Sequence, residues 1–194
     1  MHNKMNKNKL LNKTKLGNII HLTFSNWGFS WGGVIDNRKG EYLLFAQLFL
    51  ILAHLIPAWP KISNTNFILG ALPNILGFLL FTIGLFLAIN ALVELGTNIS
   101  PLPEPKKGAL LITKGAYSYC RHPLYQAIII CSLGFTIYKS SILHLLLFTL
   151  LIIVLRLKSK REEESLKKIH DSYEKYMALT TALIPGISFL DWRH

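Results

Sequence analysis

The stretch that decides the fold is residues 62–93, which read ISNTNFILGALPNILGFLLFTIGLFLAINALV and carry no charged side chain over 32 positions. A helix that crosses the hydrocarbon core of a bilayer needs about 20 residues, so this run is long enough to span it. Pro73 lies inside the run, and its missing N–H predicts a helix start or a kink there. We therefore expect a span over about 74–95, with 62–73 as an interfacial lead-in.

Three further uncharged runs cover residues 42–60, 122–138 and 140–155. The first is long enough to cross a bilayer. We interpret the two shorter runs as a hairpin of spans over about 122–138 and 140–157, in preference to one buried or re-entrant element. Gly77 and Gly84 lie seven residues apart on one face of the 74–95 span, which predicts close approach of another helix. The sequence thus predicts an all-α integral membrane protein with about four transmembrane helices.

Charge supports this topology. The chain has 21 Lys and Arg against 10 Asp and Glu, a formal net charge of +11, and 51% of its residues are hydrophobic. A basic balance suits nucleic acid or an anionic membrane surface, and the apolar runs favour the membrane, so no nucleic-acid partner is expected. Seven basic residues precede the first span, four lie between the second and third, and eight follow the fourth, against one in each other connection. By the positive-inside rule, both termini are cytoplasmic.

Two smaller features complete the domain organisation. We expect residues 1–40 to form a basic tail and an interfacial segment, and residues 41–194 to form the membrane domain. The N-terminal stretch lacks the apolar core of a secretory signal. Cys120 and Cys131 make neither a disulfide framework nor a zinc cluster, so no metal site is expected.

The connection between the second and third spans, residues 96–125, reads GTNISPLPEPKKGALLITKGAYSYCRHPLY. Three alternate prolines exclude a continuous helix across it, and a loop of this length is commonly functional. Pro123 suits the first turn of a helix, which places His122 beside the N-cap and Tyr125 in that turn. Free backbone N–H groups there suit an anionic or polar ligand. The alternative is that Arg121 and His122 are interfacial anchors and Tyr125 belongs to an aromatic belt.

The segment after the fourth span, residues 158–178, reads KSKREEESLKKIHDSYEKYMA. Its apolar residues share one helical face, so we expect a cytoplasmic amphipathic helix that continues from the membrane. An acidic cluster, Glu162 to Glu164, lies next to the membrane surface. Glu163 and Glu164 could pair with Lys167 and Lys168 on a solvated face, or the cluster could bind a cationic ligand. The segment alone leaves both interpretations open.

Together these two segments resemble the isoprenylcysteine carboxyl methyltransferase family, whose pattern the related phospholipid methyltransferases share. That pattern is a short apolar stretch, Gly-x-Tyr and Arg-His-Pro-x-Tyr, followed beyond a span or hairpin by Glu-Glu-x-x-Leu and paired tyrosines. It occurs here as LIT at 111–113, Gly115 to Tyr117, Arg121 to Tyr125, Glu162-Glu163 to Leu166, and Tyr173 with Tyr176. The resemblance covers about residues 74–186.

The resemblance implies a cytoplasmic-face pocket for S-adenosylmethionine. Carried over residue by residue, the cofactor-binding set is Leu111, Ile112, Tyr117, His122, Pro123, Leu124, Tyr125, Glu162 and Glu163. Methyl transfer to a lipophilic acceptor follows, and we favour the carboxylate of an isoprenylcysteine-type substrate. The alternatives are N-methylation of a phospholipid or another lipid, and a non-catalytic membrane scaffold.

One departure from the family pattern concerns the acceptor. Family members often place an Arg four residues before the acidic pair to hold the acceptor's carboxylate. This chain has Lys158 there, with Arg156 and Arg161 nearby. Lys lacks the bidentate fork of Arg, so this departure concerns which acceptor the protein prefers. Lys158 and Glu163 are the candidates for positioning the acceptor.

Polar residues inside the spans receive a simpler interpretation. We expect Gln47, His54 and His144 to make helix–helix hydrogen bonds rather than to bind a ligand. Asn98, in the loop on the cytoplasmic side, could help to shape the pocket.

Overall fold

The computed structural model describes residues 31–62, 67–106 and 108–193, and in these ranges the chain is helical, without a β-strand. Most of the predicted segment 1–40 therefore lies outside the described residues. The helices are α2 (Trp31–Asp36), α3 (Glu41–Ala53), α4 (Phe67–Leu95), α5 (Ala116–Tyr119), α6 (Pro123–Lys139), α7 (Ile142–Ile169) and α8 (Tyr173–Leu179), with a 3₁₀ turn, η1, at Gly96–Asn98.

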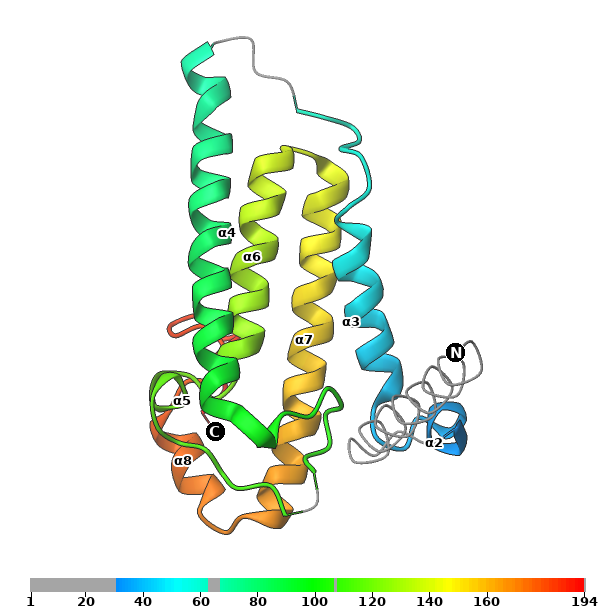
Figure 1. Cartoon of the computed structure of the whole chain (residues 1–194), viewed down its shortest axis with the longest axis vertical. Helices are drawn as coiled ribbons and strands as arrows, with labels where there is room; N and C mark the ends of the chain where they lie inside the picture. The colour runs from blue at the N-terminus through cyan, green and yellow to red at the C-terminus, as the bar shows by residue number, and fades with distance from the viewer. Residues whose placement is uncertain (1–30, 63–66, 107, 194) are drawn as a thin grey trace, which may run out of the picture.

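Four long helices stand side by side (Figure 1). α4 packs on α6, α6 on α7 and α7 on α3, so α3 and α4 lie at the two ends of the row. Along the helix axes, the short helices α5 and α8 lie near the bottom of the view, and the α6–α7 turn lies near the top (Figure 1). The apolar core lies between α3, α6, α7 and the C-terminal segment, with Leu151, Leu155 and Leu183 among its most buried side chains.

Two helices in the described ranges are long and apolar enough to cross a membrane, Ala71–Asn98 and Ile142–Ile169, judged by length and composition. Large apolar side chains stay exposed along α4, among them Phe78 (68% exposed), Phe86 (64%) and Val93 (75%). A continuous exposed face of this size suits lipid rather than water. These features agree with the expected all-helical membrane protein.

The first predicted span, 42–60, is wrong in its second half, because α3 ends at Ala53. Pro57 and Pro60 follow, and proline cannot continue a helix. The chain instead runs as a loop that is fixed to the α6–α7 turn. Ser141 Oγ accepts a hydrogen bond of 3.0 Å from the Trp59 N–H. α3 is thus about 20 Å long at 1.5 Å per residue.

The other three spans also differ from prediction at their ends. α4 begins at Phe67 and continues through Pro73, so the expected start near residue 74 is wrong; the proline removes one hydrogen bond near the helix N-terminus without ending the helix. α6 matches the predicted 122–138 closely. α7 continues past the predicted span end at 157, in agreement with the expected helical continuation, and ends at Ile169.

The expected helix over 158–178 is likewise not continuous. α7 ends at Ile169 and α8 begins at Tyr173, and His170 between them has an extended backbone. Asp171 and Ser172 occupy the turn, where short polar side chains compete with helical hydrogen bonding. The break redirects α8, so that Tyr173 and Met177 become buried.

Two buried histidines, His54 and His144, make the predicted hydrogen bonds between helices. They lie near the α6–α7 turn, far from α8 (Figure 1). The His54 ring bonds the Leu50 carbonyl through Nδ1 (2.7 Å) and Ser132 Oγ through Nε2 (2.7 Å). His144 Nε2 lies 3.0 Å from the His54 carbonyl oxygen. These contacts satisfy carbonyl groups at the C-terminus of α3, which water could not reach in a membrane.

Close approach of α4 and α6 depends on glycine, as the spacing of Gly77 and Gly84 predicts. A methyl group built on Gly84 would lie 2.6 Å from Cys131 Sγ and 2.8 Å from the Cys131 nitrogen. One built on Gly77 would lie 2.6 Å from the Gly134 carbonyl oxygen, and Gly134 meets Gly77 in the same way. The two backbones are therefore in direct contact.

We expect Gly84→Leu to force these helices apart and to lower the free energy of unfolding by about 1–3 kcal/mol, as overpacking does. The measurement is thermal unfolding in detergent. Thr82→Leu is the matched control, because Thr82 is exposed on the same helix. Equal melting temperatures of the two variants would contradict the contact.

Candidate functional site

A cavity lies where the loop after α4, the short helix α5, the C-terminal half of α7 and α8 come together. Residues from all four segments line it, from η1 and the loop 98–112 to Leu166 on α7. Four predicted binding residues are on this wall: Leu111, Ile112, Tyr117 and Glu162. The structure thus brings together side chains from two segments about 50 residues apart in sequence.

The N-terminus of α6 places a second group of predicted residues next to this wall. Pro123 is the first residue of α6, as the sequence predicts, and His122 is the N-cap itself rather than a neighbour of it. The Tyr125 hydroxyl donates a hydrogen bond of 2.8 Å to Glu162 Oε2. The His122 ring stacks on Tyr125, with centroids 5.4 Å apart and planes 9° from parallel. His122 and Tyr125 are buried behind the wall, and Leu124 in the same turn is half-buried.

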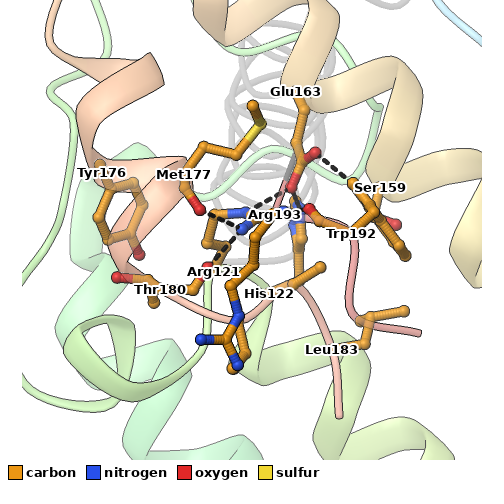
Figure 2. Close-up of polar contacts among 12 residues, drawn as sticks. Arg121, His122, Ser159, Glu163, Tyr176, Met177, Thr180, Leu183, Trp192 and Arg193 are labelled. Atoms are coloured by element: carbon orange, nitrogen blue, oxygen red, sulfur yellow. Dashed lines mark hydrogen bonds and ion pairs between the residues drawn. The ribbon is translucent and has the colours of Figure 1, made fainter. Parts of the chain in front are cut away.

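Glu163 is not among the residues that line the cavity, and it forms a buried ion pair with Arg121 (Figure 2). Its Oε1 lies 2.7 Å from Arg121 Nε and 3.0 Å from His122 Nε2. Its Oε2 accepts a hydrogen bond of 2.6 Å from Trp192 Nε1. The solvated-face interpretation, in which Glu163 pairs with Lys167, is therefore wrong for this residue. Both oxygens of Glu163 have structural partners.

Arg121 completes the cluster and is 4% exposed, so it is not an interfacial anchor. Besides Glu163, its guanidinium donates to the carbonyl oxygens of Met177 (2.9 Å), Thr180 and Trp192 (2.7 Å) (Figure 2). One side chain from the loop thus holds the end of α8 and the C-terminal segment in place. The sequence could not identify these partners, because three of the four are backbone carbonyls.

Lys158 lies on the inner side of α7 and is 2% exposed. Its ammonium donates a hydrogen bond of 2.6 Å to Gln47 Oε1 on α3 and lies 5.2 Å from the centroid of the Tyr125 ring. The two neighbouring cations point elsewhere. Arg156 contacts Phe189, and Arg161 donates to carbonyl oxygens of the α2–α3 turn. Lys158 is therefore the basic residue of this group that faces the interior.

Sequence reasoning placed Tyr173 in the family pattern but not in the site. The structure puts it on the cavity wall together with Tyr176, their ring centroids 5.8 Å apart. Tyr173 is 1% exposed, and its hydroxyl has no hydrogen-bond partner among the described residues. A buried unpaired hydroxyl costs free energy, so this group is a candidate for contact with a ligand. Asn98 and Arg121 also line the cavity.

The tyrosines of the wall are neutral. Burial, and next the charge of Glu162, raises the pKa of Tyr117 well above its usual range. Burial likewise raises the pKa of Tyr173 and of Tyr176. The wall therefore combines the Glu162 carboxylate and uncharged phenol rings with the guanidinium of Arg121, which is paired with Glu163. The carboxylate and the ring faces can attract a cation.

Comparison with known proteins agrees with this geometry. The sequence model of the phospholipid methyltransferase family matches residues 72–173, a range that contains every predicted site residue. The chain is also similar to the protein-S-isoprenylcysteine O-methyltransferase of Schizosaccharomyces pombe. The two are 32% identical over 186 residues, which cover 87% of this chain and 77% of the relative.

The buried ion pair generates a stability prediction. Arg121→Met leaves Glu163 buried without its cation, and we expect a loss of about 3–5 kcal/mol in the free energy of unfolding. Thermal unfolding in detergent measures it. Arg193→Met is the matched control, since its ion pair with Asp191 is partly exposed and should change stability little. A melting temperature for Arg121→Met that equals the control's would contradict the proposed role of the pair.

The reactivity of Cys120 tests whether the C-terminal segment covers the loop before α6. Its thiol is buried against the Ala182 and Leu183 carbonyls, and burial raises its pKa to about 12. The reactive thiolate is therefore scarce at pH 7–9. In Cys131→Ser protein, we expect maleimide to leave Cys120 unmodified at these pH values until the chain is unfolded.

The control for this labelling is a cysteine at the neighbouring position. Tyr119→Cys, placed in a background without native cysteines, should react readily because Tyr119 is 82% exposed. Labelling of folded Cys120 at the rate of this control would show that the segment does not close over the loop.

Proposed function

The chain belongs to the phospholipid methyltransferase family, and we propose that it transfers a methyl group from S-adenosylmethionine to the carboxylate of an isoprenylcysteine-type acceptor at the cytoplasmic face of a membrane. That it is a membrane methyltransferase for a lipophilic acceptor follows from the family. The observation that carries the finer proposal is the meeting of Tyr125 from α6 with Glu162 from α7 beside a cavity lined by aromatic rings.

The cavity wall has the chemistry that the donor needs. S-adenosylmethionine carries a sulfonium, an ammonium and a carboxylate, and when bound it supplies the electrophilic methyl group. Glu162 would oppose its positive charge, and the neutral rings of Tyr117 and Tyr173 would attract a sulfonium. The unpaired hydroxyl of Tyr173 would gain a partner. Leu111 and Ile112 supply the apolar part of the wall.

The remaining predicted residues support this wall in the proposal. His122, Pro123 and Tyr125 fix the position of Glu162, since Tyr125 bonds it and His122 stacks on Tyr125. Leu124 belongs to the same turn. Glu163 acts as a positioning residue for His122 rather than as a ligand, because its oxygens already have partners.

The size of the cavity adds a requirement. Its volume is about 80 Å³, which is room for several waters and too little for a whole nucleoside-bearing donor. We infer that loop residues 109–112 move outward on binding. They are half-buried or exposed, and one of their restraints is a single hydrogen bond from the Leu110 N–H to the Asn98 side chain (3.1 Å).

The acceptor's carboxylate would be held on the other side of Tyr125. Lys158 has N–H groups beyond the one bonded to Gln47, and the Gln47 amide adds two more donors. A carboxylate is already ionised near neutral pH, so methyl transfer to it needs no strong base. The protein's contribution would then be alignment of the acceptor and exclusion of water. The depth of Lys158 beside the apolar helices suits an acceptor with a lipid tail.

We also propose the topology expected from the sequence. α3, α4, α6 and α7 would make four passes, with both termini and α8 cytoplasmic. The concentration of basic residues in the connection before α6 and after α7 supports it. α6 is about 25 Å long at 1.5 Å per residue, and α3 is shorter still, so the bilayer would be thinned beside them or the chain would cross partly as a loop.

The test is binding and transfer with methyl-labelled S-adenosylmethionine in purified protein. We expect Glu162→Gln to weaken donor binding about tenfold or more, since it removes a charged partner. Glu164→Gln, an exposed neighbour in the same cluster, should leave binding unchanged. Label should enter an S-farnesylcysteine analogue rather than phosphatidylethanolamine; the opposite result favours the lipid N-methyltransferase. No saturable donor binding, and no transfer to either acceptor, would favour the scaffold.

Tyr173→Phe separates a ligand-contacting hydroxyl from a structural one. Removing an unpaired buried hydroxyl should raise the melting temperature of the donor-free protein, by the equivalent of about 1 kcal/mol. The same change should weaken donor binding. A variant that is more stable and binds the donor as tightly as the wild type would remove Tyr173 from the proposed site.

A further inference from the structure

A second cluster lies on the outer side of α7, away from the cavity. It consists of Arg156 and Lys160 from α7 with Phe189 and Trp192 from the C-terminal segment, and we call it the basic-aromatic patch. Its four residues line neither the cavity nor the Lys158–Tyr125 contact. Within the described part of the chain, its one hydrogen bond with a predicted site residue runs from Trp192 Nε1 to Glu163, which lies outside the cavity lining.

Both cations lie near the same indole ring. The Arg156 guanidinium carbon lies 5.6 Å from the centroid of Trp192, and Lys160 Nζ lies 5.6 Å from the same ring. Arg156 also stacks over Phe189 at 4.1 Å and donates to its carbonyl oxygen through Nε (2.7 Å). Since Nε is occupied in this way, the Nη1 and Nη2 groups are the ones left to bind an external acceptor.

The positive charge of the patch is not compensated inside the described part of the chain. Arg156 and Lys160 form no ion pair with any described residue. Asp191, the acid nearest in sequence to Trp192, is paired with Arg193 (2.7 Å). Glu164, four residues after Lys160, is exposed and likewise makes no ion pair within this range. Two uncompensated cations at one ring favour an anion with several oxygens.

The patch continues an apolar stripe of α7. Leu146, Leu150, Ile153 and Leu157 are all at least 40% exposed, and their spacings of four, three and four place them on one helical face. The next step of three residues along the same face reaches Lys160, and Arg156 is adjacent to it. An anion bound at the patch would thus lie at the end of an exposed apolar surface.

We propose that the basic-aromatic patch binds the phosphate of an anionic phospholipid whose acyl chains lie along the α7 stripe. A phosphate accepts hydrogen bonds from the guanidinium and the ammonium together. The acyl chains cover apolar side chains that the protein leaves exposed along α7. A soluble phosphate would satisfy the cations but not the stripe, so the geometry favours a lipid.

The Trp192 ring, which both cations approach, is fixed by the fold. Trp192 Nε1 donates to Glu163 (2.6 Å) and the Trp192 carbonyl accepts from Arg121 (2.7 Å), as Figure 2 shows. The indole therefore keeps its place whether or not a lipid is bound, and the two cations are held against a rigid surface. Such preorganisation lowers the cost of binding.

The experiment is lipid retention by the full-length protein, measured by native mass spectrometry after titration with phosphatidylglycerol or phosphatidylcholine. We expect wild-type protein to retain phosphatidylglycerol selectively, and the double variant Arg156→Gln/Lys160→Gln to retain it about tenfold less. Lys167→Gln/Lys168→Gln removes two exposed charges from the same helix and should retain it like the wild type. Glycerol phosphate at the same concentrations should not displace the lipid.

Each other outcome overturns the proposal. Equal losses in the two double variants would show a general effect of charge, and displacement by glycerol phosphate would show a site for soluble phosphate. No preference of the wild type for phosphatidylglycerol would show that no anionic lipid binds. If the double variant unfolds, Lys160→Gln alone decides, because Lys160 makes no hydrogen bond to a described residue. None of these results depends on methyl transfer.

Discussion

The buried pair of Arg121 and Glu163 is the interaction on which the site depends. Taking both charges out of water is unfavourable unless further hydrogen bonds satisfy them. Here Arg121 also binds three carbonyl oxygens, and Glu163 also binds His122 and Trp192. The pair therefore joins the loop before α6, the C-terminal half of α7, the end of α8 and the last residues of the chain. His122 adds a second link between the loop and α7, since its ring nitrogens lie 3.0 Å from Glu163 Oε1 and 3.8 Å from Glu162 Oε2.

This arrangement explains why two adjacent glutamates differ in role. Successive residues of a helix point about 100° apart, so Glu163 reaches the interior while Glu162 faces the cavity. Because Arg121 is bonded to Glu163, it does not neutralise Glu162. The carboxylate on the cavity wall accepts a hydrogen bond from the Tyr125 hydroxyl and is placed to meet a cationic ligand.

The sequence predicted the features that depend on neighbouring residues, such as hydropathy and the positions of glycine and proline. It did not predict the features that depend on contacts between residues far apart in the chain. Uncharged runs located α4, α6 and α7, the glycine spacing identified the α4–α6 contact, and Pro123 marked the start of α6. The early end of α3 follows from Pro57, a local signal that the hydropathy of the run concealed. Pro73 led to the opposite error, a predicted helix start that the structure does not have. A helix whose remaining residues are apolar tolerates one missing hydrogen bond.

The site shows the same division. The pattern of motifs named Tyr117 and Glu162, which the fold brings to one wall. It could not distinguish Glu163 from Glu162, because the partners of Glu163 lie 41 and 42 residues earlier and 29 residues later in the chain. Nor could it show that the Tyr173 hydroxyl lacks a partner, since that depends on the break between α7 and α8.

The helix α7 contributes residues to three neighbouring regions: the exposed outer surface, the interior next to α3, and the cavity. Its outer side runs from apolar residues to Arg156 and Lys160, its inner side presents Lys158 to α3, and its end presents Glu162 to the cavity. A lipophilic acceptor arrives from the bilayer, whereas a charged methyl donor arrives from water. A membrane helix that continues well past the apolar layer is the simplest element that can contact both. The part of α7 beyond the predicted span end at 157 therefore carries Lys158 and Glu162, the two charged residues that the proposal assigns to the acceptor and to the donor.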